Sequence, residues 1–477
     1  MSDNFRTLEN ILDNRITTDP FECSFYNRDL ASVPGIMTKM FNTMPDAVVM
    51  PVSTEEVAEI VKFARENHCS LIPRAGATSA YMNTVPIKGG IVVDLNRMRG
   101  VLRLDDEHLQ VEVWCGTTWQ ELEDYLHNHG LALCTYPSSA IAATVGGWFN
   151  TEGYGIGSAK HGGFHELVEA AEVVLSNGEV ITATRNGEHP LSWLLGKEGT
   201  VGIVTKITFK IRKKPAYSAN LAVAFSSIEM MSQAVAQLMN VSLLPYNIHF
   251  TDSDFFAMQD QIGFKSPILD KHVITVTYQE NFAVLSEATK IVQTIAGQYD
   301  GMVLPDLVAD EEWNERLYAL RLKRGGPTML AAEVVLSINS LNDFYQEVKR
   351  LNQRTAVYGH MMGPDKMNIL VQYYADESKS LEYLFLLAKT KHIYAAALKL
   401  KGRPYGIGIW NSVYLKQAYA KEVLNQRNLI KQKLDPAGIM NPGKYYAPPL
   451  LLNPLLFNLG SGSANLLSQI AGIGKGR

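Results

Sequence analysis

The sequence is poor in cysteine and contains no long apolar run. Its four cysteines are widely scattered and form no CxxC pair; they are Cys23, Cys69, Cys115 and Cys134. Because zinc and iron–sulfur sites need clustered thiolates, neither kind of site is supported, and isolated thiols are typical of a cytosolic protein. No stretch of 18 apolar residues is present, and the charged N-terminal residues show no apolar segment typical of a signal peptide. The sequence therefore predicts a cytoplasmic protein.

Excess positive charge is missing as well. The 44 Lys and Arg residues are outnumbered by 48 Asp and Glu residues, which gives a net charge of −4. A protein that binds nucleic acid normally carries a basic excess on one face, so we expect no nucleic-acid partner. At 477 residues the chain is too long for one compact core, and two or three domains are expected.

Glycine is abundant in one stretch, since seven of the 36 glycines fall within residues 143–164, ATVGGWFNTEGYGIGSAKHGGF. Ordering glycine is entropically costly, so such a run needs a compensating contact with bare backbone. A second run of small residues is PRAGATS at 73–79. Consecutive small residues let backbone N–H groups converge on an anion. The two loops together predict a long ligand with phosphate at its centre, although neither GxGxxG nor GK[ST] is present.

Helix and strand patterns divide the chain into segments. Ser53 and Glu56 have the spacing of a capping box, as do Thr118 and Glu121, and each pair begins a helix pattern. The surrounding strands predict two small α+β lobes that divide near residue 100, and later strands predict a second domain with an antiparallel sheet. The predicted segments are an N-terminal extension (1–44), the two lobes (45–215), the second domain (216–410), a C-terminal segment (411–446) and an apolar tail (447–477).

Four motifs, in the same order and spacing, resemble the FAD-linked oxidase family, the superfamily of vanillyl-alcohol oxidase and p-cresol methylhydroxylase. They are PRAGATS, ATVGGWFNTEGYG, LLGKEGTVGIVTKITFKI and LDPAGIMNPGKYY, and the resemblance runs from about residue 45 to 446. The D-lactate and glycolate dehydrogenases are the nearest branch. The resemblance implies an α+β fold with a two-lobed FAD-binding domain of the vanillyl-alcohol oxidase type, an α+β cap domain with an antiparallel sheet, and a C-terminal segment that returns to the lobes.

The resemblance also implies which residues contact FAD. The pyrophosphate loop, the glycine-rich loop and a later strand supply them: Pro73, Arg74, Ala75, Gly76, Ala77, Thr78, Ser79, Pro137, Ser138, Thr144, Gly146, Gly147, Thr151, Glu152, Gly153, Tyr154 and Ile203. Ala75 and Ala77 stand where the family usually has glycine, so we expect a differently shaped phosphate nest. The loop lacks the kind of histidine that attaches flavin in some relatives, so non-covalent FAD is expected, and His161 is expected to face solvent.

The metal-binding motifs of the 2-hydroxy acid branch, GHxGDGNxH and GEHG, are incomplete in this chain. The segment YGHMMGPDKMNIL retains His360 and Asn368 but has Leu370 where the second histidine belongs. The segment GRPYGIG has Pro404 and Tyr405 where glutamate and histidine are expected. One histidine cannot supply the three or four ligands that zinc usually takes, so no metal is predicted.

The catalytic candidates are Tyr405, Arg321, His360 and Arg403. Tyrosines at the flavin face of other branches receive a proton, and Arg403 would lower the pKa of the Tyr405 phenol by its charge. The alternative is that Tyr405 only packs against the flavin. Arg321 stands where the family uses arginine for the substrate carboxylate, a task suited to bidentate pairing, with Arg324 as the second choice. His360 either hydrogen-bonds the substrate or is a satisfied histidine of the pocket wall.

The sequence leaves three functions open. The first is oxidation of a small hydroxylated substrate, a 2-hydroxy acid above others, by an FAD-dependent oxidoreductase. The second is a metal-free alcohol or phenol oxidase that uses Tyr405, and the third is a catalytically idle flavin-binding subunit of a redox complex.

The apolar tail at 447–477 bears on the partner. It has leucine clusters and no acidic residue, which favours docking to a partner subunit or peripherally at the inner face of the membrane. Packing against the parent domain is the alternative. The resemblance to the D-lactate and glycolate dehydrogenase branch implies an electron acceptor of the quinone or iron–sulfur type.

Overall fold

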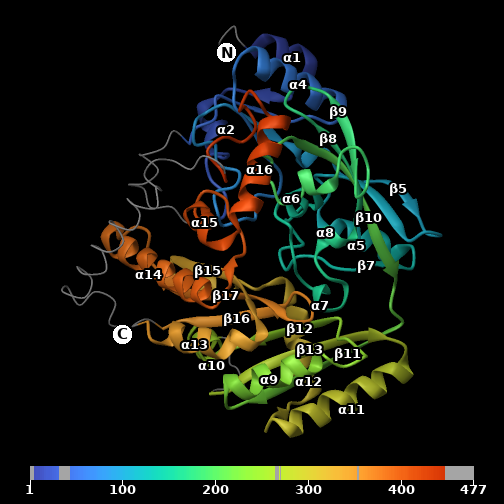
Figure 1. The fold of residues 1–477 in the computed structure, drawn as a ribbon, viewed down its shortest axis with the longest axis vertical. Coiled ribbons are helices and arrows are strands. Elements are labelled where there is room, and N and C mark those ends of the chain that lie inside the picture. Colours follow the sequence, from blue (N-terminus) through green and yellow to red (C-terminus); the bar gives the residue numbers. More distant parts are fainter. Residues whose placement is uncertain (1–4, 32–42, 264–267, 269, 352–353, 446–477) are drawn as a thin grey trace.

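The computed structural model describes residues 5–31, 43–263, 268, 270–351 and 354–445, so the predicted tail lies outside the described residues. Figure 1 shows three sheets, with two in the upper part of the view and the third below them. All pairings in the third sheet are antiparallel. The mixture of helices with these sheets confirms the predicted α+β fold class.

The first sheet has four strands in the order β1-β2-β4-β3. Its strands are β1 (Ile16–Thr17), β2 (Ala47–Val49), β3 (Leu71–Arg74) and β4 (Ile91–Asp94). Helix α4 (Thr54–Glu66) connects β2 to β3, and α1 (Arg6–Leu12) packs beside it. The Ser53 side chain accepts a hydrogen bond from Glu56 N, as the capping-box spacing predicts, and Val57, Ile60 and Val61 are buried on one face of α4.

The second sheet follows the order β5-β6-β10-β8-β9, with β7 paired to β10. Its strands are β5 (Val101–Asp105), β6 (Gln110–Trp114), β7 (Leu131–Leu133), β8 (Val168–Val174), β9 (Val180–Thr184) and β10 (Ile203–Lys213). Its helices are α5 (Trp119–Asn128), α6 (Val145–Asn150), α7 (Ser158–His161) and α8 (Phe164–Leu167). Thr118 caps α5 by accepting from Glu121 N. One hydrophobic cluster joins both sheets, and Trp119 at its centre contacts the rings of Trp148 and Phe164.

The third sheet, which we call the cap sheet, has eight strands in the order β14-β11-β13-β12-β16-β17-β15-β18. Their bounds are β11 (Tyr217–Phe225), β12 (Asn247–Thr251), β13 (His272–Glu280), β14 (Met302–Val303), β15 (Thr328–Ser337), β16 (Ala356–Met361), β17 (Lys366–Ala375) and β18 (Arg403–Pro404). Apolar side chains such as Ile248, Val334 and Ile369 point to one face and pack against four helices: α9 (Ile228–Leu238), α11 (Phe282–Gln298), α13 (Leu341–Lys349) and α14 (Ser380–Lys399).

The opposite face of the cap sheet is only partly covered. Helices α10 (Ser253–Gln261) and α12 (Asp306–Asn314) pack there, with Phe256 and Ala309 against β11 and β13. Because side chains alternate along a strand, the residues on this face are those at alternate positions to the apolar set. The part of this face that α10 and α12 leave uncovered lies beside the lobes, and we call it the free face of the cap sheet.

The C-terminal segment lies against the lobes. Figure 1 shows α16 (Lys421–Leu434) beside the N-terminal elements, and α15 (Leu415–Ala418) precedes it. Leu71 N donates to Ile439 O at 2.8 Å, and Asn441 N donates to Leu71 O at 2.8 Å. Residues near 440 thus extend the first sheet beside β3. Among the described residues, no helix combines the length and apolar character needed to cross a bilayer.

Candidate active site

A cavity of about 690 Å³ lies between the lobes and the free face of the cap sheet. Its lining comes from residues 73–84 and 137–156 of the lobes, from the segment 316–324, and from strands β12, β15, β16 and β17. The volume is that of a typical binding site for a small molecule or cofactor. The two loops predicted from small residues therefore lie on one wall of the same cavity.

The first loop exposes unused backbone donors. The N–H groups of Gly76, Ala77, Thr78 and Ser79 donate no hydrogen bond to any described residue, and all four residues line the cavity. Ala77 has φ = 48°, a left-handed conformation that usually requires glycine. A turn with unpaired amides in this conformation forms the anion-binding nest that the sequence predicts.

The two loops are in direct contact. A Cβ atom at Gly76 would lie 2.0 Å from Ala142 O, so no larger residue fits between the loops. In the second loop the amides are already used: Gly147 N donates to Thr144 Oγ1 at 3.2 Å, and Gly155 N donates to Ser158 Oγ at 2.9 Å. The first loop therefore offers the anion site, and the second shapes the wall beside it.

Most of the residues predicted to contact FAD line the cavity, namely Pro73, Arg74, Ala75, Gly76, Ala77, Thr78, Ser79, Pro137, Ser138, Thr144, Gly146, Gly147, Thr151 and Tyr154. Three do not. Ile203 is fully buried in the core and its backbone pairs with Val174. A Cβ at Gly153 would lie 1.9 Å from Trp148 Nε1, and Glu152 packs beside Gly196. Gly202 and Val204, on either side of Ile203, line the cavity in its place.

The cap sheet presents polar side chains to the cavity. The register pairs His249 with His360, His360 with Asn368, and Leu370 with Glu333 across four neighbouring strands. Paired residues share a face of a sheet, and all of these residues line the cavity. Asn247, two residues before His249, lines it as well. The sequence analysis did not identify Glu333, Asn247 or His249, although a single glutamate in the apolar strand AAEVVLS is an unusual signal.

Glu333 is a partly buried carboxylate that lines the cavity. Its side chain accepts hydrogen bonds from the Tyr81 hydroxyl and from Asn368 Nδ2, the latter at 2.5 Å. Burial raises the pKa of Glu333, whereas the hydrogen bonds from Tyr81 and Asn368 oppose this rise. Tyr81 belongs to the lobes, so this contact joins the lobes to the cap sheet.

Several buried polar atoms around Glu333 have no partner among the described residues. They are His360 Nε2, Asn368 Oδ1 and Asn247 Oδ1, and each residue lines the cavity. Burial, followed by the charge of His249, lowers the pKa of His360 to about 4, so its imidazole is neutral near pH 7. Buried polar atoms normally have partners, so this wall is suited to a polar ligand.

Tyr405 lines the cavity, but burial outweighs the effect that was predicted for Arg403 on the pKa of its phenol. Its hydroxyl accepts from Tyr154 N at 2.8 Å and lies 3.2 Å from Tyr154 O. Burial raises the pKa of Tyr405 well above its ordinary value, and Arg403 only partly opposes this rise. Arg403 itself does not line the cavity, since its guanidinium lies over the Tyr419 ring, 5.9 Å from the centroid.

Arg321 does not line the cavity either. Its Nη2 atom donates to both carboxylate oxygens of Glu312, at 2.8 and 2.9 Å, and its guanidinium lies 4.9 Å from the centroid of Phe255. The charge of this arginine is therefore already paired. The cavity-lining cations of the same segment are Arg316, Lys323 and Arg324.

His161 is not among the residues lining the cavity, and its side chain is partly buried rather than facing solvent. Its ring lies 6.0 Å from that of Tyr246, and burial lowers its pKa to about 4.

The donor set for a metal is also incomplete in space. Leu370 lies beside Glu333 in the ladder, and Pro404 pairs with Val334 in β18. Among the residues that the structure describes, no group of three or more His, Cys, Asp or Glu side chains could hold a metal ion.

The residues present fit FAD. The unused amides of the first loop suit a diphosphate, and the contact of Gly76 with Ala142 leaves no room for a side chain between the loops. The segments 73–79, 137–147 and 198–204 would hold the cofactor along one wall of the cavity. The cap sheet forms the opposite wall.

Comparison with protein families gives two matches that together cover most of the chain. Residues 45–184 match the family described as the FAD binding domain, and residues 214–445 match the C-terminal domain of FAD linked oxidases.

Among curated proteins, the chain is 26% identical over 436 residues to glycolate oxidase subunit GlcD of Bacillus subtilis, a match that spans 86% of this chain and 91% of the relative. It is 27% identical over 462 residues to the mitochondrial D-lactate dehydrogenase (cytochrome) of Arabidopsis thaliana, spanning 92% of this chain and 79% of the relative.

Solved structures share the fold. p-Cresol methylhydroxylase with bound substrate has a TM-score of 0.80 at 17% identity, over 93% of this chain and 97% of the other. 4-Ethylphenol oxidase from Gulosibacter chungangensis has a TM-score of 0.76 at 16% identity, over 95% of this chain and 99% of the other.

Proposed function

The chain belongs to the FAD-linked oxidases, and on that premise we propose that it oxidises a small hydroxylated substrate, a 2-hydroxy acid of the lactate or glycolate type. It is an FAD-linked oxidoreductase of the D-lactate and glycolate dehydrogenase branch. The proposal concerns the substrate class, the chemistry without a metal and the non-covalent attachment of FAD.

One observation carries the proposal. The unused amides of residues 76–79 and the unpartnered polar atoms of the cap sheet lie in the same cavity. Bound FAD would supply the redox chemistry, taking up hydrogen and an electron pair from the substrate carbon. The chain then needs only to place the substrate between the two walls and to manage the proton of its hydroxyl group.

The cationic segment supports a carboxylate substrate. Arg316, Lys323 and Arg324 line the cavity, and Arg316 is oriented by its hydrogen bonds to Tyr136 Oη and Trp313 O, both at 3.0 Å. Arginine suits carboxylates because it offers parallel N–H donors. We assign to this segment the role that the sequence analysis gave to Arg321.

The donor set supports chemistry without a metal and non-covalent FAD. Leu370 and Pro404 replace two of the three expected ligands, which leaves His360. Among the described residues, the histidines that line the cavity are His249 and His360, both on the cap sheet, so neither belongs to the loops that would hold FAD.

A phenol is the second candidate substrate. Met329, Tyr358, Leu370 and Trp410 also line the cavity and give it apolar surface for a ring. In this case Tyr405 would contact the phenol, as the sequence analysis proposed.

Anaerobic titration of the FAD-loaded protein tests these candidates. We expect D-lactate or glycolate to bleach the flavin absorbance, whereas 4-methylphenol and glycerol leave it unchanged. Bleaching by the phenol alone would favour the second candidate, and no bleaching would indicate an idle flavin-binding subunit. Acid precipitation should release free FAD, and pigment that stays with the protein would contradict non-covalent binding.

The electron acceptor and the location in the cell stay predictions. The acceptor is a quinone or an iron–sulfur partner subunit, and docking through residues 447–477 or at the inner face of the membrane depends on a segment outside the described residues.

A further inference from the structure

We propose that Glu333 is the catalytic base that accepts the proton of the substrate hydroxyl group, with Tyr81 and Asn368 as the residues that position it. This inference rests on the proposed function, because it needs a substrate with a hydroxyl group and FAD as the oxidant.

The first argument is the lack of a compensating cation. Glu333 is partly buried on β15 and lines the cavity, yet no Lys, Arg or His side chain forms an ion pair or hydrogen bond with it among the described residues. Its two side-chain donors, Tyr81 and Asn368, are neutral. A carboxylate that is largely shielded from water and has no cation beside it is costly to keep charged, so it gains from taking up a proton.

The second argument is the chemistry of the surrounding wall. Asn368 Nδ2 donates to Glu333, so its Oδ1 atom is the free end of the amide, and Asn247 Oδ1 is also unpartnered. Both free atoms accept hydrogen bonds and neither can donate one. A hydroxyl group satisfies such a wall because it donates, whereas a carboxylate would meet Glu333 and these acceptors without a proton to offer.

The third argument is that the Glu333 carboxylate can accept further hydrogen bonds. A carboxylate has about four acceptor sites, and the structure uses one on each oxygen of Glu333. The titratable groups around it are the hydroxyls of Tyr81 from the lobes, Tyr394 from α14 and Tyr405 after β18, together with the neutral His360 on β16. Of the acidic groups in this set the carboxyl group has the lowest ordinary pKa, so Glu333 is the one that accepts a proton as an anion.

The step balances without another reactant. The O–H bond of the substrate breaks and a new O–H bond forms on a Glu333 oxygen, while the hydrogen on the carbon leaves with its electron pair to the flavin. The substrate carbon–oxygen bond becomes a carbonyl. The proton on Glu333 returns to solvent after the product leaves.

Anaerobic stopped-flow reduction of the FAD-loaded protein by the acid that bleaches it tests this role across pH. In the wild type the rate should rise with pH through the titration of Glu333, because the base must be deprotonated. Glu333→Gln should slow reduction about 10²–10⁴-fold and abolish this rise, the range typical of losing a proton-transfer group. Glu333→Asp should restore part of the rate and the pH dependence.

Tyr81→Phe separates positioning from simple structural support. The hydrogen bond from Tyr81 lowers the pKa of Glu333, so its removal should shift the rise in rate to higher pH. Glu347→Gln, an exposed carboxylate paired with Arg350, is the matched control and should leave the pH profile unchanged.

Ligand binding gives a readout that needs no turnover. For a 2-hydroxy acid the probe is 2-hydroxy-2-methylpropanoate, which has no hydrogen on its carbinol carbon and so cannot reduce the flavin. Calorimetry should show binding that is weaker in Glu333→Gln by about 10-fold or more, as expected for a hydrogen bond to a charged group. If Glu333→Gln keeps the reduction rate, the pH profile and the probe affinity of the wild type, then Glu333 is not the base, while the proposed function stands. If no compound of the panel reduces the wild type, then both the proposed function and the assignment of the base are wrong.

Discussion

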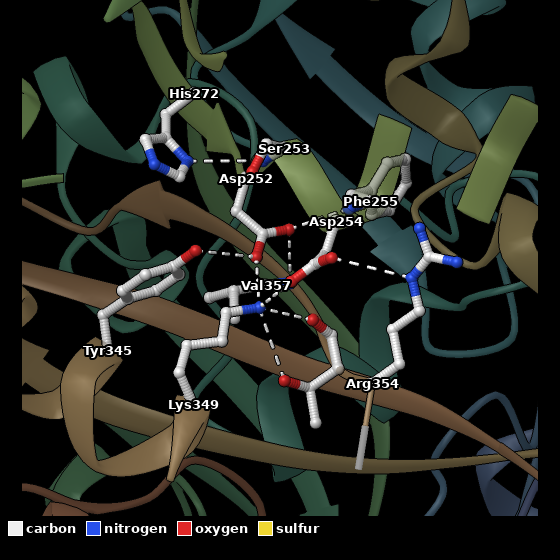
Figure 2. Close-up of polar contacts among 10 residues, drawn as sticks. Asp252, Ser253, Asp254, Phe255, His272, Tyr345, Lys349, Arg354 and Val357 are labelled. Atoms are coloured by element: carbon white, nitrogen blue, oxygen red, sulfur yellow. Dashed lines mark hydrogen bonds and ion pairs between the residues drawn. The ribbon is translucent and has the colours of Figure 1, made fainter. Parts of the chain in front are cut away.

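Two carboxylates in the cap domain, the buried Asp252 and the partly buried Glu333, differ in how their charge is compensated. Asp252, at the end of β12, accepts hydrogen bonds from Phe255 N and Val357 N at 2.9 Å and from Lys349 Nζ at 2.7 Å. Figure 2 shows these contacts converging on Asp252, with the Tyr345 hydroxyl at 3.4 Å on the other side. Glu333, on the free face of the same sheet, has two neutral donors and no cation among the described residues.

The neighbours of the two carboxylates differ in the same way. Lys349 also contacts Asp254 at 2.7 Å and Thr355 O at 2.6 Å, so every member of the Asp252 cluster has a partner (Figure 2). Beside Glu333, Asn368 Oδ1 and His360 Nε2 have no partner in the part of the chain that the structure describes. Burial raises the pKa of both carboxyl groups, so burial alone does not distinguish them. In the Asp252 cluster the complete hydrogen-bond network stabilises the fold. The incomplete network beside Glu333 lies at a cavity and is suited to a ligand.

Breaking the Asp252 cluster should have the largest effect on stability. Lys349→Met removes the cation and leaves a buried carboxylate unpaired, which typically costs about 3–5 kcal/mol of unfolding free energy. Urea denaturation followed by circular dichroism measures the loss. Glu333→Gln should cost much less, because Glu333 has no cation to lose among the described residues. Equal losses in the two variants would contradict the distinction drawn here.

Acid should weaken the Asp252 cluster through its histidine. Burial, followed by the charge of Lys349, lowers the pKa of His272 to about 4, and Ser253 N donates to its Nδ1 atom at 3.3 Å. In the unfolded chain His272 takes up a proton near pH 6.5, whereas in the folded chain it does not. The contribution of the neutral His272 to the free energy of unfolding is therefore complete above pH 6.5 and is lost as pH falls toward 4.

His272→Gln isolates that contribution. The stability of the wild type minus that of the variant should fall by up to about 1.4 kcal/mol per pH unit over this range, as measured by urea denaturation at several pH values. A difference that is constant with pH would show that His272 is not held neutral.

The cofactor wall should be sensitive to a single methyl group. Gly76→Ala places a Cβ where Ala142 O lies 2.0 Å away, so the two loops must separate. We expect FAD affinity to fall about 10- to 100-fold, since overpacking costs about 1–3 kcal/mol. Quenching of flavin fluorescence on reconstitution measures it. Gly297→Ala, where an added Cβ meets nothing within 4 Å, should bind FAD as the wild type does.

The smallest expected effect comes from Tyr405. Tyr405→Phe leaves Tyr154 N without its acceptor, and an unsatisfied buried amide costs about 1–3 kcal/mol, with the lower end expected beside a cavity that admits water. The thermal midpoint should fall, while the pH profile of flavin reduction keeps its shape. If flavin reduction in Tyr405→Phe no longer depended on pH, Tyr405 rather than Glu333 would be the group that accepts the proton.

Much of the fold could be predicted because its signals are local. Ser53 with Glu56 and Thr118 with Glu121 begin their helices as the capping-box spacing predicts. The small residues at 73–79 predict a nest because adjacent amides are positioned by the backbone of one turn. Most of the residues predicted to contact FAD line the cavity for the same reason, whereas Ile203 lies on the face of β10 that is turned into the core.

The wall of the cavity that the cap domain forms could be predicted only in part. Arg321 matched its motif but is paired with Glu312 from α12, a helix whose position no local pattern specifies. The pKa of Tyr405 follows from its burial, which outweighs the charge of Arg403 close by in the sequence. The pairing of Arg321 and the pKa of Tyr405 both depend on residues that are close in space but not adjacent in the sequence.

The sequence by itself determined the family, the helix starts, the small-residue nest and the incomplete metal motif, since each depends on residues a few positions apart. Only the tertiary structure decided that Asn247, Glu333, His360 and Asn368 share one wall, because the register of β12, β16, β17 and β15 brings together strands far apart in the chain. That Asn247 Oδ1, His360 Nε2 and Asn368 Oδ1 lack a partner among the described residues could be recognised only after packing had removed water from around them.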